Sequence, residues 1–310
     1  MKNSLIVKIS EGLGNQLFMY ANAFALSKDK HIELLIDDTS GFFNKKNKLR
    51  GQKYLLNYFN INEILAPDRL KPDTNLKHFL KKINLKLNLF IDKKNYLSEK
   101  THLIDNKKKI INMSNYQNIN FTQNVFIQGN YENENYFKKY RIELIDLFSV
   151  KSKFLTNNKY HIDKLTNTNS VSLHVRQNRF SDQKINKDKV INVNKSKEFL
   201  QNNLEYINKS INFFNSKFND ATFFIWSNDF TGLNDFFSKY PRNKIYFIKN
   251  NDAINDFNLF KYSKHFIVGP STFHWWGAWL NNSPNKICLR PNNINPSNNN
   301  NFWPKRWIPI

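Results

Sequence analysis

The sequence has only one cysteine, Cys288, among its 310 residues. A single thiol excludes an intramolecular disulfide and any zinc site built mainly from cysteine. The chain also lacks an uninterrupted apolar stretch of the length that spans a membrane, which is about 20 residues. Its first apolar run, residues 5–9, is too short for the core of a signal peptide. We therefore expect a soluble, cytoplasmic protein.

Acidic residues are scarce as well. The chain has 25 Asp and Glu against 47 Lys and Arg, so its formal net charge is +22. Such a charge predicts anionic partners: nucleic acid, phosphorylated small molecules or an anionic membrane surface. Because the positive residues are dispersed and are mostly lysines in loops, a nucleic-acid-binding protein is only an alternative interpretation. A basic amphipathic pattern over residues 76–90 predicts a helix that covers a domain or, as the alternative, lies on anionic lipid.

The first part of the chain alternates between strand and helix patterns. Residues 5–9 and 31–36 are mainly apolar segments typical of strands, and residues 17–25 repeat apolar side chains at helical spacing. This strand–helix–strand order predicts a parallel α/β sheet.

The turn before that helix reads Glu11-Gly12-Leu13-Gly14-Asn15-Gln16. With Asp37 downstream, the turn is similar to a dinucleotide fingerprint, but Leu17 occupies the position of the third glycine. An NAD-dependent oxidoreductase is therefore only a second alternative. We favour a loop in which a sugar or phosphate approaches the backbone, with side-chain amides supplied by Asn15 and Gln16.

The second half of the chain repeats the alternation, and a polar stretch at residues 151–169 precedes it. We expect a linker there and place the boundary at residue 165, which gives domains of residues 1–165 and 166–310. Three predicted strands of the second domain end in polar groups. These groups are His174-Val175-Arg176, Ser227-Asn228-Asp229 and Ser271-Thr272-Phe273. Because ligands of such sheets bind at the carboxyl ends of strands, the three groups predict one site.

The last of these groups belongs to the segment 266–280, around which the prediction is built. An apolar run stops at Gly269-Pro270, Ser271 and Thr272 are good N-cap residues, and a helix pattern follows. The free backbone N–H groups and the positive end of the helix dipole would bind an anion. The alternative is a plain strand–helix turn that its serine caps.

The side chains at these strand ends suit a nucleotide diphosphate. The guanidinium of Arg176 would bind the diphosphate with two hydrogen bonds, and Asn228 or Asp229 would pair with a nucleobase edge. His174 is either part of this site or a buried histidine that positions Arg176. The chain has no Asp-x-Asp, the carboxylate pair with which metal-dependent sugar transferases hold the nucleotide and its cation. Protein cations and dipoles must then meet the leaving charge.

Several segments together resemble the bacterial α-1,2-fucosyltransferases of glycosyltransferase family 11. Residues 12–18, Gly-Leu-Gly-Asn-Gln-Leu-Phe, are similar to the N-terminal signature of that family. Residues 129–137, Ser227-Asn228-Asp229 and the run 256–280 resemble three later signatures, and Trp303-Pro304 and Trp307-Ile308 fit the end. The similarity spans nearly the whole chain in the right order.

This resemblance implies a fold, an activity and partners. The fold would be an α/β GT-B fold, with two Rossmann-like domains facing a cleft. Residues 1–165 would form the acceptor-side domain and residues 166–310 the GDP-fucose-binding domain. The activity would be that of a metal-independent, inverting galactoside 2-α-L-fucosyltransferase, with GDP-β-L-fucose as a substrate and no cofactor. The acceptor would be a galactose-terminated oligosaccharide of O-antigen or lipopolysaccharide, free or lipid-linked, and the enzyme would be cytoplasmic, on the inner face of the bacterial inner membrane.

The resemblance also implies site residues. Arg176 and His174 would be catalytic. The expected donor-binding residues are Gly14, Asn15, Arg176, Asn228, Asp229, Ser271, Thr272 and Phe273, and the acceptor-side candidates are Gln16, Glu132, Glu134 and His274. In the His-x-Arg-Arg-x-Asp pattern of the family, Gln177 and Arg179 stand here for the second arginine and the aspartate. The general base stays open among Glu11, Asp37, Glu132 and Glu134, unless the transition state is dissociated enough to need none.

Overall fold

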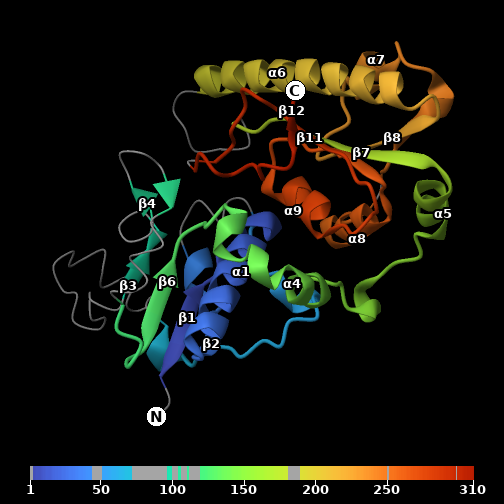
Figure 1. The fold of residues 1–310 in the computed structure, drawn as a ribbon. Helices are drawn as coiled ribbons and strands as arrows, with labels where there is room; N and C mark the ends of the chain where they lie inside the picture. Colours follow the sequence, from blue (N-terminus) through green and yellow to red (C-terminus); the bar gives the residue numbers. More distant parts are fainter. Residues whose placement is uncertain are drawn as a thin grey trace. The chain divides into compact units, whose positions relative to one another are not determined.

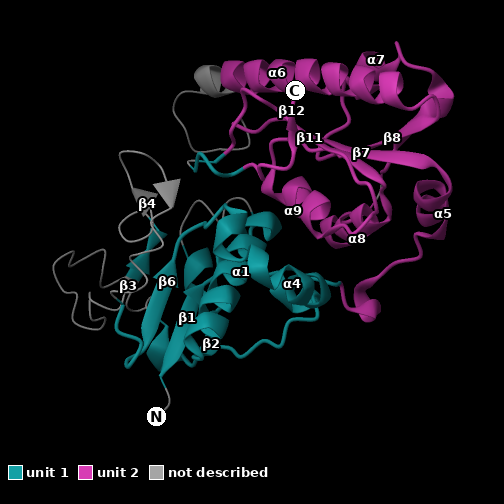
Figure 2. Cartoon of the chain, in the orientation of Figure 1, with its two compact units in different colours: residues 1–149, 297–302 teal, residues 150–296, 303–310 magenta. Residues whose placement is uncertain are grey.

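The structure is a computed structural model that describes residues 3–43, 51–71, 96–99, 104–105, 110–111, 119–180, 189–249, 251–297 and 299–310. The expected basic helix at residues 76–90 lies outside these ranges. The chain forms two compact units (Figure 2). Unit 1 comprises Met1–Ser149 and Ser297–Phe302, and unit 2 comprises Val150–Pro296 and Trp303–Ile310.

Unit 1 is built on a four-stranded parallel sheet (Figure 1). Its strands, in spatial order, are β2 (Glu33–Asp37), β1 (Ser4–Lys8), β6 (Val125–Gln128) and β3 (Tyr96–Ser98). The described residues also include a short antiparallel pair, β4 (Ile104–Asp105) and β5 (Ile110–Ile111).

The helix α1 (Leu13–Lys30) connects β1 to β2 and is mostly buried. It ends at His31, whose left-handed backbone lets its N–H bond back to the oxygen of Lys28. The described part of unit 1 also contains the helix α4 (Arg141–Leu147) and short 3-10 turns. The 3-10 turns are η1 (Ser40–Phe42), η2 (Leu56–Tyr58), η3 (Asp68–Leu70), η7 (Glu134–Tyr136) and η8 (Lys138–Tyr140).

An aromatic contact ties the late segment 297–302 to unit 1. The ring of Phe18, on α1, lies 5.9 Å from the ring of Phe137 and 6.3 Å from that of Phe302. All three side chains are fully buried. Burying one such side chain contributes about 1.5–3 kcal/mol, so this contact holds the segment firmly.

Unit 2 contains a six-stranded sheet in which every described pairing is parallel. Its strands, in spatial order, are β12 (Ile308–Pro309), β11 (Cys288–Arg290), β10 (His265–Ile267), β7 (Asn169–Val175), β8 (Ala221–Ser227) and β9 (Ile245–Phe247). The central strands β7 and β8 are almost wholly buried, as strands covered on both faces must be.

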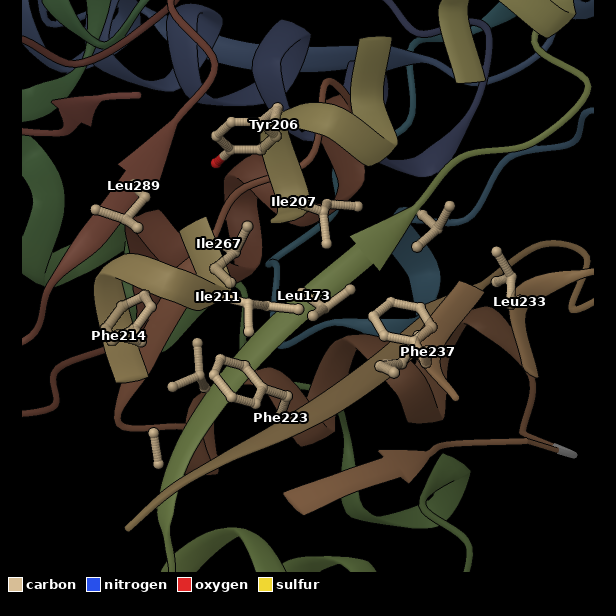
Figure 3. Close-up of a cluster of buried hydrophobic side chains, with 14 residues drawn as sticks. Leu173, Tyr206, Ile207, Ile211, Phe214, Phe223, Leu233, Phe237, Ile267 and Leu289 are labelled. Carbon is tan, nitrogen blue, oxygen red and sulfur yellow. The ribbon is translucent and has the colours of Figure 1, made fainter. Parts of the chain in front are cut away.

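Helices cover both faces of this sheet (Figure 1). They are α5 (Lys159–Asn167), α6 (Lys189–Lys217), α7 (Leu233–Phe237), α8 (Ala253–Leu259) and α9 (Thr272–Leu280), with the turns η9 (Ser152–Phe154), η10 (Arg242–Lys244) and η11 (Phe260–Tyr262). Figure 3 shows the core on one face, where Leu173 of β7 and Phe223 of β8 pack with Ile211 of α6 and Phe237 of α7. Successive side chains of a strand point to opposite faces, so Ser172, His174 and Trp226 belong to the other face.

The predicted α/β architecture with two parallel sheets is confirmed. The predicted linker at residues 151–169 is only partly irregular, because it contains η9 and α5. The strands β3, β11 and β12 were not predicted. No helix in the described ranges is both long and apolar enough to cross a bilayer.

Candidate functional site

In unit 2, the chain segments at the carboxyl ends of the neighbouring strands β7 and β10 contact each other. A Cβ placed on Gly269, after β10, would lie 2.4 Å from the backbone oxygen of His174, near the end of β7. Only glycine fits at that separation. The ring of His174 also lies 6.1 Å from the ring of Phe273. The contact therefore brings the end of β7 to the start of α9, as the sequence predicts.

The N-terminus of α9 keeps its capacity to bind an anion. Ser271 is the N-cap, with an extended backbone, and its side chain makes no capping hydrogen bond. The first turn contains no acidic residue, and Ser271, Thr272 and Phe273 are partly exposed. The first N–H groups of a helix have no partner within it and carry the positive end of its dipole. The structure thus disagrees with the alternative of a turn that its serine caps.

Arg176 follows β7 directly and is partly exposed. His174 beside it is buried, and burial, together with the charge of Arg176, lowers its pKa to about 3. The imidazole is therefore neutral at physiological pH. Its Nδ1 is buried and has no hydrogen-bond partner among the described residues. A neutral ring of this kind can orient its neighbours or share a hydrogen bond, but it adds no positive charge to the site.

His274 was predicted on the acceptor side, at the edge of the site, but its side chain is completely buried. Its Nδ1 accepts a hydrogen bond from the N–H of Gly269 at 3.3 Å, and its Nε2 lies 2.9 Å from the hydroxyl of Ser172. Because Nδ1 accepts, we assign the ring proton to Nε2. Burial lowers the pKa of His274 well below its usual value. The prediction for His274 is wrong: this histidine secures the turn before α9.

Gln177 and Asn228 hold the loops after β7 and β8 together. The Asn228 side chain accepts from the N–H of Gln177 at 2.9 Å and donates to its carbonyl at 3.2 Å. The buried Gln177 side chain donates to the carbonyls of Asp229 and Thr231 at 2.7 and 3.0 Å. Both ends of the Asn228 amide are therefore engaged in fixing the loop.

The carboxylate of Asp229 is engaged within the same loops. It accepts from the N–H of Thr231 at 2.9 Å and from the Asn178 amide at 3.0 Å. The hydrogen bonds from Thr231, with a smaller contribution from Asn178, lower its pKa, so Asp229 is charged near neutral pH. Since local donors already hold this carboxylate, Asp229 is a less suitable partner for a nucleobase than the sequence indicates.

Arg179 contributes positive charge near the start of α9. Its guanidinium donates to the carbonyl of Pro270 at 2.9 Å and to that of Pro296 at 3.1 Å. It also lies 5.2 Å from the ring of Phe199. Pro270 directly precedes the N-cap Ser271, so the cation reinforces the positive end of the helix dipole.

In unit 1, Gln16 is completely buried and its amide is fully used. Its nitrogen donates to the carbonyls of Glu11 and Lys53, each at 2.8 Å, and its oxygen accepts from the N–H of Leu55 at 2.9 Å. Gln16 therefore fastens residues 53–55 to α1. The expectation that it contacts an acceptor is not supported, because the completely buried amide is not accessible to a sugar.

Glu11 has a left-handed backbone, with φ of 65°, which is uncommon for a residue other than glycine. Its partly exposed carboxylate accepts a hydrogen bond from Asn15, in the first turn of α1. A pyrophosphate bound as in dinucleotide enzymes would occupy the same helix end and meet this negative charge. The arrangement disfavours the NAD alternative and suits neutral sugar hydroxyls near Gly14 and Asn15.

Exposure separates the four general-base candidates. Asp37 is completely buried, and its carboxylate accepts from the N–H groups of Thr39 and Ser40 at 3.2 and 3.0 Å. Glu134 is also buried. Glu11 and Glu132 are partly exposed, so these two carboxylates are the ones that a substrate proton can reach.

Comparison with known proteins identifies the family. The model of Glycosyl transferase family 11 matches residues 4–309. This chain belongs to glycosyltransferase family 11. It is 28% identical over 311 residues to the O-antigen biosynthesis glycosyltransferase WbnK of Escherichia coli, covering 94% of this chain and 95% of that protein. It is also 28% identical over 319 residues to the alpha-1,2-colitosyltransferase of Escherichia coli, covering 99% and 98%.

A solved structure with a similar fold is the Se-Met fucosyltransferase NodZ from Bradyrhizobium. The TM-score is 0.51 at 12% identity, over 96% of this chain and 97% of that one. At this identity the likeness concerns the fold alone. The match to the family model confirms the predicted family. The likeness to NodZ shows a fold of the GT-B type.

Sequence reasoning missed one structural residue of this family 11 glycosyltransferase, Glu99 in unit 1. Its buried carboxylate accepts from the N–H groups of Asn130 and Tyr131, each at 2.9 Å. Gly129 is required beside it, since a Cβ there would lie 2.5 Å from the Cβ of Glu99. Glu99 therefore shapes the loop that leads to Glu132. It follows a three-residue strand in a Lys- and Asn-rich region, where no pattern indicated it.

Proposed function

We propose that this chain is an inverting, metal-independent α-1,2-fucosyltransferase that uses GDP-β-L-fucose as its donor. The observation that carries the proposal is the contact between the end of β7 and the start of α9. Arg176 follows β7 directly, the N-terminus of α9 at Ser271–Phe273 is uncapped, and the guanidinium of Arg179 donates to the carbonyl of Pro270 just before it. A departing diphosphate needs such a set of fixed donors and dipoles.

Unit 2 binds the donor in this proposal, and unit 1 supplies contacts to the acceptor. The 2-hydroxyl oxygen of a terminal β-galactoside attacks the anomeric carbon of fucose on the face opposite GDP. The carbon–oxygen bond to the β-phosphate breaks, its electron pair leaves with GDP, and the product linkage is α. Glu11 or Glu132 takes the hydroxyl proton, since these are the exposed carboxylates among the candidates.

The acceptor in this proposal is a galactose-terminated oligosaccharide of O-antigen or a related glycan, free or lipid-linked. The relative WbnK, described as an O-antigen biosynthesis enzyme, supports this class of acceptor. A position at an anionic membrane surface, on the cytoplasmic side of the bacterial inner membrane, agrees with the net charge of +22.

A second donor is considered because a relative of nearly full-length coverage is named a colitosyltransferase. Colitose is fucose without its 3-hydroxyl. The two donors considered, GDP-fucose and GDP-colitose, have the GDP moiety in common. The two donors differ in one sugar hydroxyl, and a site that hydrogen-bonds it would reject the analogue that lacks it.

The test is a transfer assay with the purified full-length chain, GDP-fucose and a panel of β-galactosides. We expect a product one fucose heavier, with an α-1,2 linkage in its NMR spectrum. GDP-colitose is compared at equal concentration. Absence of transfer from either donor to every galactoside, by a protein that melts cooperatively, would reject the proposal.

A further inference from the structure

Arg290, the last residue of β11, has a guanidinium that makes no ion pair within the described ranges. Its Nη1 donates to the carbonyl of the next residue, Pro291, at 3.2 Å. Its Nε is buried and has no hydrogen-bond partner among the described residues. Burial lowers the pKa of Arg290, but an arginine keeps its charge at physiological pH. A partly buried cation without an anion is costly, so this one calls for an explanation.

The register of β11 places Arg290 next to the proposed donor site. Ile267 of β10 pairs with Leu289 of β11, and the N–H of Val268 donates to the carbonyl of Leu289 at 2.9 Å. The next step of this register sets Arg290 beside Val268, and neighbouring strands lie about 4.8 Å apart. Because Gly269 and the turn into α9 follow Val268, Arg290 lies next to the segment that leads into that helix.

The side chain of Arg290 is also on the face of the sheet that α9 covers. Leu289 and Ile267 belong to the core on the α6 face, which Figure 3 shows. Successive side chains of a strand point to opposite faces, so Arg290 and Phe266 belong to the other face. The ring of Phe266 lies 5.8 Å from the ring of His274, in the first turn of α9. Arg290 therefore shares one face and the carboxyl edge of the sheet with the start of α9.

The loop after β11 returns to the same helix end. Arg179 donates to the carbonyl of Pro270, just before α9, and to the carbonyl of Pro296, at the end of the loop that Arg290 begins. Neither residues 268–273 nor residues 288–296 include an acidic side chain. Two arginines and the positive end of a helix dipole thus gather where these two segments supply no negative charge.

We propose that Arg290 is a further donor-binding residue, whose guanidinium binds the diphosphate of GDP-fucose together with the start of α9. This inference rests on the proposed function, since it adds a residue to the same site. The phosphates are the anionic part of that donor, and a guanidinium binds phosphate oxygens with two parallel hydrogen bonds. Nε and Nη2 form the edge of the group that the Pro291 contact leaves for them. Neutral sugar hydroxyls would leave the charge of Arg290 without an anion.

The first experiment measures the binding of GDP and of guanosine to the full-length wild type, Arg290→Met and Arg290→Lys by ligand-observed NMR. Guanosine has the base and ribose of GDP without its phosphates. We expect Arg290→Met to bind GDP about tenfold to a hundredfold more weakly, as for the loss of hydrogen bonds to a charged group, and guanosine as the wild type does. Arg290→Lys should be intermediate for GDP, because it keeps the charge without the fork. An equal loss for GDP and guanosine would indicate a structural role and reject the inference.

The second experiment is a thermal melt of the same three proteins. A residue that serves a ligand leaves its charge without an anion in the free protein, so Arg290→Met without ligand should melt at or above the wild-type temperature. GDP should raise the melting temperature of Arg290→Met less than that of the wild type, since the stabilisation follows the affinity. If ligand-free Arg290→Met melts several degrees below the wild type, Arg290 supports the fold instead, and the inference is overturned.

The matched control is Arg242→Met, which removes the same charge from the same unit. Arg242 is exposed and precedes β9, at the amino ends of the parallel strands. This variant should bind GDP as the wild type does; a loss equal to that of Arg290→Met would show an effect of net charge and reject the assignment. If the wild type binds no GDP, the proposed function fails as well. If Arg290→Met binds GDP as tightly as the wild type, only the assignment of Arg290 fails.

Discussion

Gln177 and Asn228 are joined by two hydrogen bonds, in which the side chain of Asn228 contacts both the N–H and the carbonyl of Gln177. The Gln177 side chain then reaches two carbonyls of the next loop, those of Asp229 and Thr231. Gln177, which replaces the second arginine of the family pattern, thus holds two loops together, and it is adjacent to Arg176, on which transfer is proposed to depend.

Replacing Gln177 tests this clamp. Gln177→Ala removes two hydrogen bonds, while the carbonyl of Asp229 keeps the one from the hydroxyl of Ser227, so we expect a loss of about 1–3 kcal/mol in the free energy of unfolding. Transfer should fall with it, because Arg176 is adjacent. Gln177→Arg, which restores the family residue and can donate to the same carbonyls, should retain the stability. Urea unfolding and initial transfer rates of the three proteins decide; an unchanged stability of Gln177→Ala would show that the clamp contributes little.

The two central strands of unit 2 and the turn at Gly269 could be predicted from sequence because their signals are local. Buried strands are continuous apolar runs, and Gly-Pro followed by Ser-Thr ends a strand and begins a helix. The sequence could also place Arg176, Asn228 and Ser271 at strand ends, since parallel strands bring those ends to one edge.

Side-chain environment could not be predicted in this way. His274 and Gln16 are polar residues within motifs and were predicted to face the acceptor, yet tertiary contacts bury both completely. Glu99 depends on backbone N–H groups about thirty residues later in the chain. Burial and long-range hydrogen bonds depend on the packed fold, and one sequence carries no pattern for them.

Acid should destabilise the protein through His174. Its pKa is about 3 in the folded chain, against an ordinary value near 6.5. Between these values the unfolded state binds the proton first, so the free energy of unfolding falls as the pH drops below about 6.5, by about 1.4 kcal/mol per pH unit. Above that pH the contribution of His174 is fully present.

Asp256 has the opposite effect on stability. Burial raises its pKa to about 7, so the folded state keeps a proton that the unfolded state loses, and the free energy of unfolding falls as the pH rises from about 4 to 7.

The variant His174→Gln isolates the histidine. Its free energy of unfolding is compared with that of the wild type at pH 7 and pH 5, so that the contributions of Asp256 and His274 largely cancel. We expect the free energy of unfolding of the wild type, relative to that of His174→Gln, to fall by about 2 kcal/mol from pH 7 to pH 5. A constant difference would mean that His174 does not titrate as its burial implies.

Transfer should survive an excess of chelator. In the proposed mechanism Arg176, Arg179 and the start of α9 take the place of the cation that metal-dependent transferases use. Magnesium should stimulate only modestly, through the free nucleotide. Initial rates are measured after dialysis against chelator and again after adding manganese. Loss of transfer that manganese restores would reject the metal-independent assignment.

Arg176 is the most direct test of the proposed mechanism. If its guanidinium meets the charge that develops on the departing diphosphate, Arg176→Ala should lower turnover about a hundredfold to a thousandfold, or roughly 3–4 kcal/mol. Arg176→Lys should recover only part of the rate, because an ammonium lacks the two-pronged geometry of the guanidinium. The control is Arg242→Ala. Arg242 is exposed in the same unit and precedes β9, so it lies at the amino ends of the parallel strands, away from Arg176 at their carboxyl ends. Turnover is measured at saturating GDP-fucose beside a thermal melt of each variant. Should Arg176→Ala keep most of its turnover, or lose it only by unfolding, Arg176 would be structural, and stabilisation of the leaving group would have to come from α9 and Arg179.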